Sequence, residues 1–223
     1  LLHYDASDPA APSGETALVV PDFSDEFPRC QRIAVQGDYA VVAAKADQIQ
    51  PLPVVALLDI ADPAAPRVLD SLVLADQIDG VAWFAGQPVV AAQEAGVVTL
   101  QIDGDLLSKS NRVEGLGNVR AVAAVGDLLV AGTLGGTVHF LDADLGLLGS
   151  VAVDGGVQAI AALPDGRIAV AMGSAGLALV SPPTGGAAAA VTGNVATRGT
   201  AVRMGVLGDG SVAVANWRDV RVY

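Results

Sequence analysis

A repeat of 40 residues dominates this sequence. Glycine recurs in a short polar turn between two apolar runs, and again where a third apolar run begins. The first set is Gly86, Gly126 and Gly166, and the second is Gly96, Gly136 and Gly176. A fixed period of this length, built from short β-type runs, is typical of propellers and other arrays in which each repeat buries its face against the next. The sequence therefore predicts an all-β fold.

The length of the repeat identifies the expected unit. Four antiparallel strands of about five residues, with their turns, need about 40 residues, which is one propeller blade. We expect a single β-propeller domain over residues 1–223, with complete four-stranded blades at 30–76, 77–115, 116–155 and 156–195. Residues 1–29 and 196–223 should each supply part of a blade, so parts of six blades are expected. Because Leu1 falls inside an expected strand, we expect the chain to be a fragment of a longer protein.

The composition suits thin sheets that stack closely. Apolar residues make up 52% of the chain, but aromatic residues only 4%. Small residues recur at one register, which indicates close approach where blades converge: Ala91, Ala131, Ala171 and Ala215. No apolar run reaches the roughly 18 residues that a membrane-spanning helix needs, so the chain is not expected to span a membrane.

Charge and cysteine content exclude several classes of function. The formal net charge is −12, which argues against nucleic-acid binding because that depends on clustered Lys and Arg. Cys30 is the single cysteine, so an intrachain disulfide or a thiolate metal cluster is excluded. The sequence contains neither a G-x-S-x-G elbow nor a glycine-rich phosphate loop followed by Lys. No cofactor is expected.

No metal site is expected either. His3 and His139 are the two histidines, and they fall on third strands of different blades, whereas histidine ligation of a metal needs converging rings. Two D-x-D pairs, at 103–105 and 142–144, lie in expected turns and lack the later acidic ligand of a calcium loop. Turn formation accounts for both pairs.

Two strings near the N-terminus carry a family resemblance. DASDPAAP at residues 5–12 and DIADPAAP at residues 59–66 each follow an expected strand, and AVQGDYAVVAA precedes the second. Together they resemble the repeat of the LVIVD family of bacterial β-propellers, in which a strand of the form V-x-G-x-Y-A-Y-V-A leads to a D-x-S-D-P turn. The resemblance is specific over residues 1–76. In the middle blades Asp103, Asp142 and Ser181 keep only part of the turn.

The resemblance has implications for location and partners. It implies a bacterial protein that is secreted, displayed on the cell surface or periplasmic, with further domains flanking the propeller. It carries no catalytic residues onto this chain, because the family has no catalytic motif that could be matched here.

Basic residues are expected to gather at one end of the propeller axis. In a propeller the innermost strand of each blade starts on the face that holds the loop between the second and third strands, so equivalent positions form a ring. Aligning the repeats places at these starts Arg32, Asp79 or Gly80, Arg120, Gln158 and residues 198–200, the first of which is Arg198. Lys45, in an insertion that runs to Pro53, and the loop containing Trp217 and Arg218 are expected on the same face.

Such a ring of arginines predicts an anion-binding mouth, since Arg offers a planar fork of donors to carboxylates. The favoured function is a non-enzymatic interaction or scaffold module that binds a protein or anionic ligand there. Two alternatives stay open: a hydrolase or lyase that uses carboxylates and arginines at the mouth, and a structural spacer. A pocket of perturbed carboxylates would favour the enzyme, and a plugged axis would favour the spacer.

Overall fold

The computed structural model describes residues 2–5, 13–17, 30–45, 52–62, 64–216 and 219–223. All regular elements in these ranges are strands. In the same ranges there is no helix long and apolar enough to cross a membrane. The first blade consists of β3 (Cys30–Gln36), β4 (Tyr39–Ala44), β5 (Val54–Asp59) and β6 (Arg67–Val73). The second consists of β7 (Gly80–Phe84), β8 (Gln87–Ala91), β9 (Val97–Asp103) and β10 (Leu106–Val113).

The later blades repeat the pattern. The third consists of β11 (Val119–Val125), β12 (Leu128–Thr133), β13 (Thr137–Leu141) and β14 (Leu147–Ala152). The fourth consists of β15 (Ala159–Ala162), β16 (Ile168–Ala171), β17 (Leu177–Ser181) and β18 (Ala190–Val195). The fifth has three strands, β19 (Arg203–Val206), β20 (Val212–Ala215) and β21 (Val220–Val222). Consecutive strands pair antiparallel in every sheet, which confirms the predicted propeller of four-stranded antiparallel blades.

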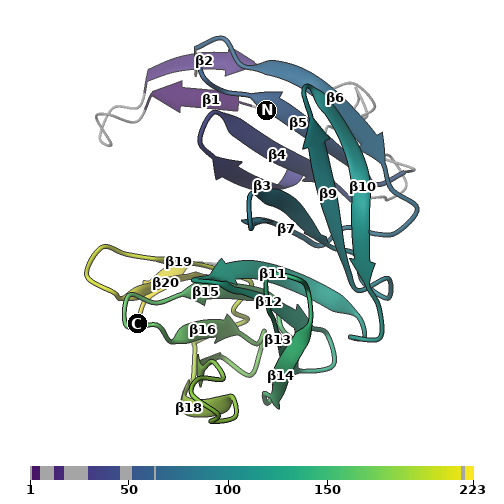
Figure 1. The fold of residues 1–223 in the computed structure, drawn as a ribbon. Coiled ribbons are helices and arrows are strands. Elements are labelled where there is room, and N and C mark those ends of the chain that lie inside the picture. Colours follow the sequence, from purple (N-terminus) through teal and green to yellow (C-terminus); the bar gives the residue numbers. More distant parts are fainter. Residues whose placement is uncertain (1, 6–12, 18–29, 46–51, 63, 217–218) are drawn as a thin grey trace.

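The innermost strands follow one another around an axis. β3 packs beside β7, β7 beside β11, β11 beside β15 and β15 beside β19. In Figure 1 β3 and β7 lie above β11, β15 and β19, with the outer strands of each blade pointing away from them.

The expectation of parts of six blades is wrong, because the residues that the structure describes form five. β1 (Leu2–Asp5) and β2 (Ser13–Ala17) form a separate two-stranded sheet. Among the described residues these strands pair only with each other, and no third strand extends them into a blade. Residues 18–29, which follow β2, lie outside the described residues.

A recurring glycine shapes the start of the third strand in three blades. Gly96, Gly136 and Gly176 have φ of +79°, +81° and +88°, a backbone conformation that L side chains rarely adopt. A Cβ at these positions would lie 2.0 Å from the carbonyl oxygen of Val113, 2.8 Å from that of Val153 and 2.4 Å from that of Val195. The glycines therefore let the loop fit against the end of the fourth strand, which explains why the sequence repeats them.

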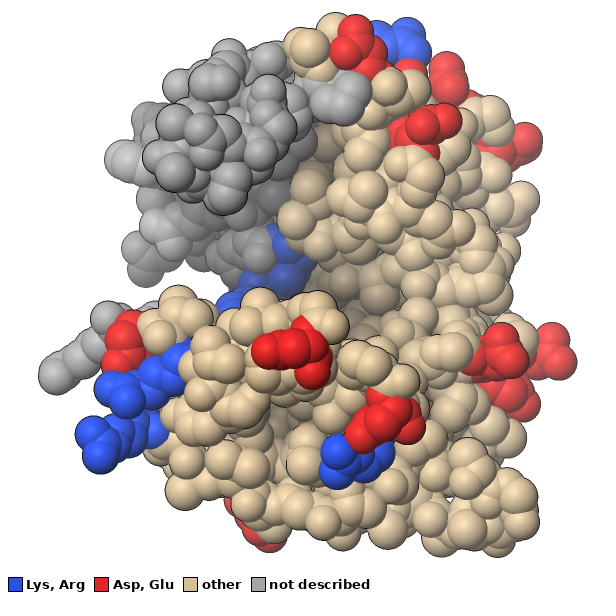
Figure 2. All heavy atoms as spheres, turned by 90° about the vertical axis from the view of Figure 1, so that its left-hand side faces the viewer, with Lys and Arg blue, Asp and Glu red and all other residues tan. Residues whose placement is uncertain are grey.

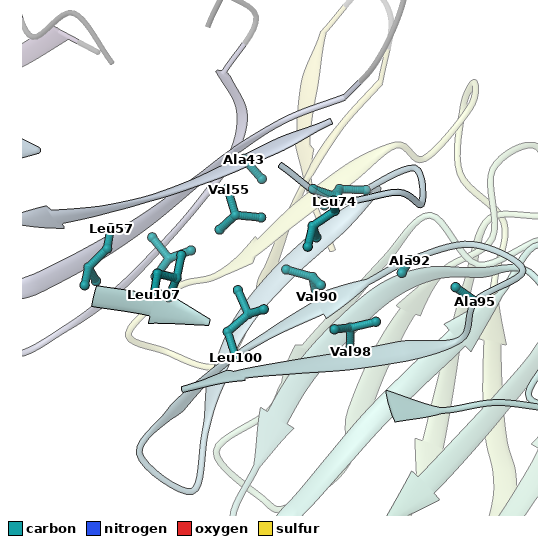
Figure 3. Close-up of a cluster of buried hydrophobic side chains, with 12 residues drawn as sticks. Ala43, Val55, Leu57, Leu74, Val90, Ala92, Ala95, Val98, Leu100 and Leu107 are labelled. Atoms are coloured by element: carbon teal, nitrogen blue, oxygen red, sulfur yellow. The ribbon is translucent and has the colours of Figure 1, made fainter. Parts of the chain in front are cut away.

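The core consists of layers between consecutive blades. Along β4, Val41 and Ala43 pack toward the second blade, whereas Val42 and Ala44 belong to a different apolar cluster, because successive side chains of a strand point to opposite faces. Figure 3 shows the layer between the first two blades, where Val55 faces Val90 and Leu57 lies beside Leu107.

The predicted alanine register lies inside these layers. Ala91, Ala131 and Ala171 are fully buried, and Ala215 is half-buried. A small side chain at this register allows the blades to approach closely near the axis, as the sequence predicted.

Candidate functional site

The innermost strand of each blade starts at the same end of the propeller axis. Two consecutive residue positions at these starts are equivalent from blade to blade. At the first position, the backbone N–H groups of Asp79, Gln158 and Val202 donate to the carbonyls of the register alanines Ala91, Ala171 and Ala215 at 2.9, 2.8 and 3.1 Å. At the second position, Arg32 lies opposite Ala43 and Arg203 lies opposite Ala215. Side chains from several blades therefore surround this end of the axis.

Asp79 lies at the centre of this end. The residue is only 7% exposed. Its carboxylate accepts three hydrogen bonds, two from side chains of other blades and one from a side chain of its own blade. Lys45 Nζ donates to Oδ1 at 2.9 Å, and Arg120 Nη1 and Gln93 Nε2 donate to Oδ2 at 2.7 and 2.5 Å. Burial by itself would raise the pKa of Asp79, but the hydrogen bonds from Lys45, Arg120 and Gln93 outweigh it and hold the pKa below its ordinary value. Asp79 is therefore ionised at neutral pH.

Local backbone features bring these side chains together. Gly80 follows Asp79, and a Cβ there would lie 3.3 Å from the carbonyl oxygen of Arg120, so glycine permits the close approach of β7 and β11. Gln93 and Val119 pair through two backbone hydrogen bonds of 3.1 and 2.9 Å, although Gln93 has φ of +49°. This bridge places the Gln93 amide and the Arg120 guanidinium on the same carboxylate.

Two further arginines complete the site. Arg32 Nε donates to the backbone carbonyl of Asp79. Burial and the nearby positive charge of Arg203 lower the pKa of Arg32 to about 10, an effect that Asp79 opposes and Arg120 reinforces. Burial also lowers the pKa of Arg203, and the negative charge of Asp79 opposes that shift. Both side chains stay protonated at neutral pH, so Arg32 and Arg203 repel each other.

We call this group of residues the mouth cluster; it consists of Arg32, Lys45, Asp79, Gln93, Arg120 and Arg203. Among the residues that the structure describes, it brings four cations around one anion, in a chain with a net charge of −12. The Lys45 and Arg120 side chains are 27% and 25% exposed, so solvent reaches the cations although Asp79 is covered. Figure 2 shows Lys and Arg atoms set back in a hollow between the upper and lower halves of the molecule.

The structure brings together some of the predicted site residues and separates others. Arg32, Lys45, Asp79 and Arg120 converge as predicted. Gln158 has the equivalent position in the fourth blade, but its Nε2 donates to Gly156 O in its own loop at 3.4 Å. It makes no hydrogen bond to the other mouth residues that the structure describes.

The alignment was wrong for Arg198. The innermost strand of the fifth blade begins at Arg203, and Arg198 lies in the connection from β18, beside Ala196, Arg221 and Tyr223. The prediction placed the strand start too early: Gly199 of the connection has φ of +102°, and the strand begins four residues later. Trp217 and Arg218, also predicted on this face, lie outside the described residues.

Sequence reasoning missed Gln93 and Arg203. Arg203 could have been found from the alanine register. It precedes its strand partner Ala215 by 12 residues, the same spacing as between Ala159 and its partner Ala171. Arg32 and its partner Ala43 are 11 residues apart. Gln93 carries no such signal. Its role depends on a left-handed backbone conformation and a bridge to the next blade, neither of which is visible locally.

The part of the chain that the structure describes contains no group of three His, Cys, Asp or Glu side chains that could hold a metal ion. His139 is half-buried on β13, and its Nε2 lies 3.0 Å from the carbonyl oxygen of Leu116. A carbonyl only accepts, so Nε2 carries the proton. Burial lowers the pKa of His139, although the bond to Leu116 opposes the shift.

Comparison with known proteins supports the fold. No protein-family model matches the sequence. No curated protein matches it either. Among solved structures, a chain in the crystal structure of the mitotic checkpoint complex is similar with a TM-score of 0.74 and 13% identity, over 97% of this chain and 65% of that chain. A protein from Lactobacillus plantarum is similar with a TM-score of 0.73 and 16% identity, over 96% of this chain and 73% of that one.

These likenesses extend to the fold alone, because the identities are low. The chain spans about two thirds of the length of the checkpoint-complex chain that it matches. The class is therefore a β-propeller with four-stranded antiparallel blades. Such a fold is consistent with a protein-interaction or scaffold module.

Proposed function

We propose that this propeller is a non-enzymatic interaction module and that the mouth cluster binds an anionic group, a carboxylate above all, of its partner. The observation that carries the proposal is the excess of cations around a covered carboxylate. Asp79 already accepts hydrogen bonds from Lys45, Gln93 and Arg120, so it cannot neutralise all four cations of the cluster. Among the described residues Arg203 forms no ion pair, and its Nη1 donates to the carbonyl of Val202 at 2.6 Å. An added anion could therefore pair with Arg203 and reduce the repulsion among the cations of the cluster.

The setting strengthens this attraction. The chain carries 24 acidic and 12 basic residues, so a surface position with a local positive surplus is distinct from its surroundings. A hollow lined by one sign of charge concentrates ligands of the opposite sign. The recessed Lys and Arg atoms in Figure 2 fit that description.

The state of Asp79 argues for binding rather than hydrolysis. A general acid needs a raised pKa so that it holds its proton near neutral pH, whereas the pKa of Asp79 is lowered. Its two carboxylate oxygens are also occupied by donors from Lys45, Gln93 and Arg120. A structural spacer is expected to have a plugged axis, whereas charged side chains surround one end of the axis here.

We further propose that the protein belongs with the LVIVD-type bacterial propellers and works outside the cytoplasm, joined to other domains. The support is the pair of D-x-x-D-P motifs in the sequence at residues 5–12 and 59–66. The second turn follows β5. In it Asp59 Oδ1 accepts the Ala61 N–H at 2.9 Å, and Asp62 Oδ1 accepts the Ala64 N–H at 3.0 Å. Both aspartates thus have a structural reason to be present in the motif.

Titration with succinate at low ionic strength, followed by calorimetry, tests the anion site. We expect Arg32→Ala and Arg203→Ala each to weaken binding roughly threefold to tenfold, the scale of one charge-assisted hydrogen bond in a half-exposed site. Arg167→Ala is the matched control, because Arg167 pairs with Asp165 in the turn between β15 and β16, at the opposite end of the axis. Unchanged succinate affinity in both mouth variants, with the fold intact by circular dichroism, would contradict the proposal.

A further inference from the structure

A second basic site lies in the groove between the fourth and fifth blades. A surface hollow of about 370 Å³ there is lined by Ala196, Arg198, Arg221, Val222 and Tyr223. Ala196 follows β18 of the fourth blade, and the last three residues belong to or follow β21 of the fifth. We call this hollow the groove site.

The groove site combines an available cation with apolar surface. The Arg221 guanidinium already pairs with Asp219, Nη2 to Oδ2 at 2.7 Å. The Arg198 side chain makes no hydrogen bond or ion pair with any residue that the structure describes, and the residue is exposed. Val222 beside it is 60% exposed, and the Tyr223 hydroxyl lies 3.4 Å from the Arg198 backbone nitrogen. A carboxylate and an apolar side chain could both be accommodated here.

Arg198 of the groove site and the mouth cluster lie at the same end of the blades and are joined by short links. Arg198 belongs to the connection that leads into β19, which begins with Arg203 of the mouth cluster. The Arg198 carbonyl accepts a hydrogen bond from Asn216 Nδ2 at 3.2 Å, and Asn216 follows Ala215, the strand partner of Arg203. In Figure 2 Lys and Arg atoms gather at the left edge of the lower half as well as in the central hollow.

We propose that an acidic, extended peptide segment of a partner protein binds across this face, with one carboxylate in the mouth cluster and another on Arg198. The inference rests on the proposed function and adds the class of partner. A small anion can occupy one site only, whereas a peptide with acidic residues on both sides of an apolar one can occupy both sites. Its apolar side chain lies against Val222 and Tyr223. Joining two weak contacts in one chain raises the overall affinity without further contacts.

A protein is a better candidate than a nucleic acid for the negatively charged partner. A nucleic acid presents a continuous row of phosphates, and its affinity comes from neutralising many of them with Lys and Arg. The groove site supplies one guanidinium, that of Arg198, without an ion pair to any described residue, and the chain as a whole has a net charge of −12. Spaced carboxylates interrupted by an apolar side chain match this pattern of charges better.

Fluorescence anisotropy with a labelled eight-residue peptide, four Glu then Phe then three Glu, tests the inference at low salt. We expect Arg198→Ala to weaken peptide binding about threefold to fivefold, the scale of an exposed ion pair, while Arg198→Lys retains most of the affinity. Succinate binding at the mouth should not change in Arg198→Ala, because that ligand does not reach the groove. Arg167→Ala again serves as the control of equal charge.

The outcomes separate the two proposals. If Arg203→Ala weakens the peptide and Arg198→Ala does not, the peptide is held by the mouth alone, which overturns this inference and leaves the proposed function in place. If neither variant has an effect on peptide or succinate, the proposed function fails as well. If a single-stranded oligonucleotide of the same charge binds as tightly as the peptide, the class of partner is wrong.

Discussion

Asp79 determines the chemistry of the mouth at the level of single residues. Its carboxylate is the shared acceptor for Lys45 of the first blade, Gln93 of the second and Arg120 of the third. Three donors from three blades converge on one side chain that is only 7% exposed. The same carboxylate therefore links the blades and keeps the surrounding cations within reach of a ligand.

Replacing Asp79 with Ala should destabilise the fold, because Lys45, Arg120, Arg32 and Arg203 would then repel one another without a counter-charge. We expect a loss of about 3 kcal/mol in the free energy of unfolding, as when one partner of a buried ion pair is removed. Urea unfolding at pH 7 measures it.

The control for this variant is Asp165→Ala, which breaks the exposed pair with Arg167 and should lower the free energy of unfolding far less than Asp79→Ala does, because solvent screens an exposed pair. Equal effects of the two substitutions would mean that burial of the Asp79 pairs contributes nothing. A more stable Asp79→Ala protein would mean that the carboxylate is not the counter-charge of the cluster.

At the level of the elements, the loop between the second and third strands depends on glycine. Gly96, Gly136 and Gly176 combine positive φ with a close carbonyl oxygen from the end of the fourth strand. Glycine in the turn between the first and second strands also has positive φ, but it faces open space, as Gly126 does with φ of +57°. Two glycines of each repeat thus have different physical reasons to be present.

This difference predicts unequal costs for the same substitution. Gly126→Ala should cost about 1 kcal/mol, the conformational penalty alone. Gly136→Ala should cost about 2–3 kcal/mol, because its Cβ would also lie 2.8 Å from Val153 O and force the end of β14 to move. Thermal unfolding of both variants checks the order. A smaller loss for Gly136→Ala than for Gly126→Ala would contradict the role of the close carbonyl.

At the level of the whole molecule, hydrogen bonds between consecutive blades supplement the apolar layers. Trp83 Nε1 donates to Ala34 O at 3.0 Å between the first two blades, and the Leu107 N–H donates to Asp70 Oδ2 at 2.7 Å. His139 makes a comparable link from β13 to Leu116, which lies in the connection between the second and third blades. Polar contacts from several elements therefore join consecutive blades in addition to the apolar layers.

Stability should fall as pH decreases, in two windows. The pKa of His139 is lowered by burial, so the unfolded chain, with a pKa near 6.5, binds the proton more readily and stability decreases as pH falls below about 6.5. The pKa of Asp79 is also lowered, so its contribution is present above about pH 3.8 and is lost as pH falls further.

Melting temperatures at pH 7.5, 5.5 and 3 test both windows. His139→Gln should remove the change between pH 7.5 and 5.5 and leave the acid window in place, since Gln can still donate to Leu116 and does not titrate. If the loss of stability between pH 7.5 and 5.5 persists in this variant, another titrating group causes it. Asp79→Asn should reduce the loss at acid pH.

Much of this architecture follows from local patterns. The 40-residue period, the glycines of the turns and the alternation of buried residues predicted strands, blades and the alanine register, because these depend on neighbours a few residues apart. Arg32, Lys45, Asp79 and Arg120 could be placed at one end of the axis for the same reason, since equivalent positions of a repeat meet in a ring.

The tertiary structure alone decided the rest. It separated β1 and β2 from the blades and brought Gln93 onto Asp79 through the bridge to Val119. Each of these depends on which distant segments pair and how closely they approach. Strand pairing, left-handed backbone at Gln93 and desolvation of Asp79 all arise from contacts between blades, and no local sequence signal encodes them.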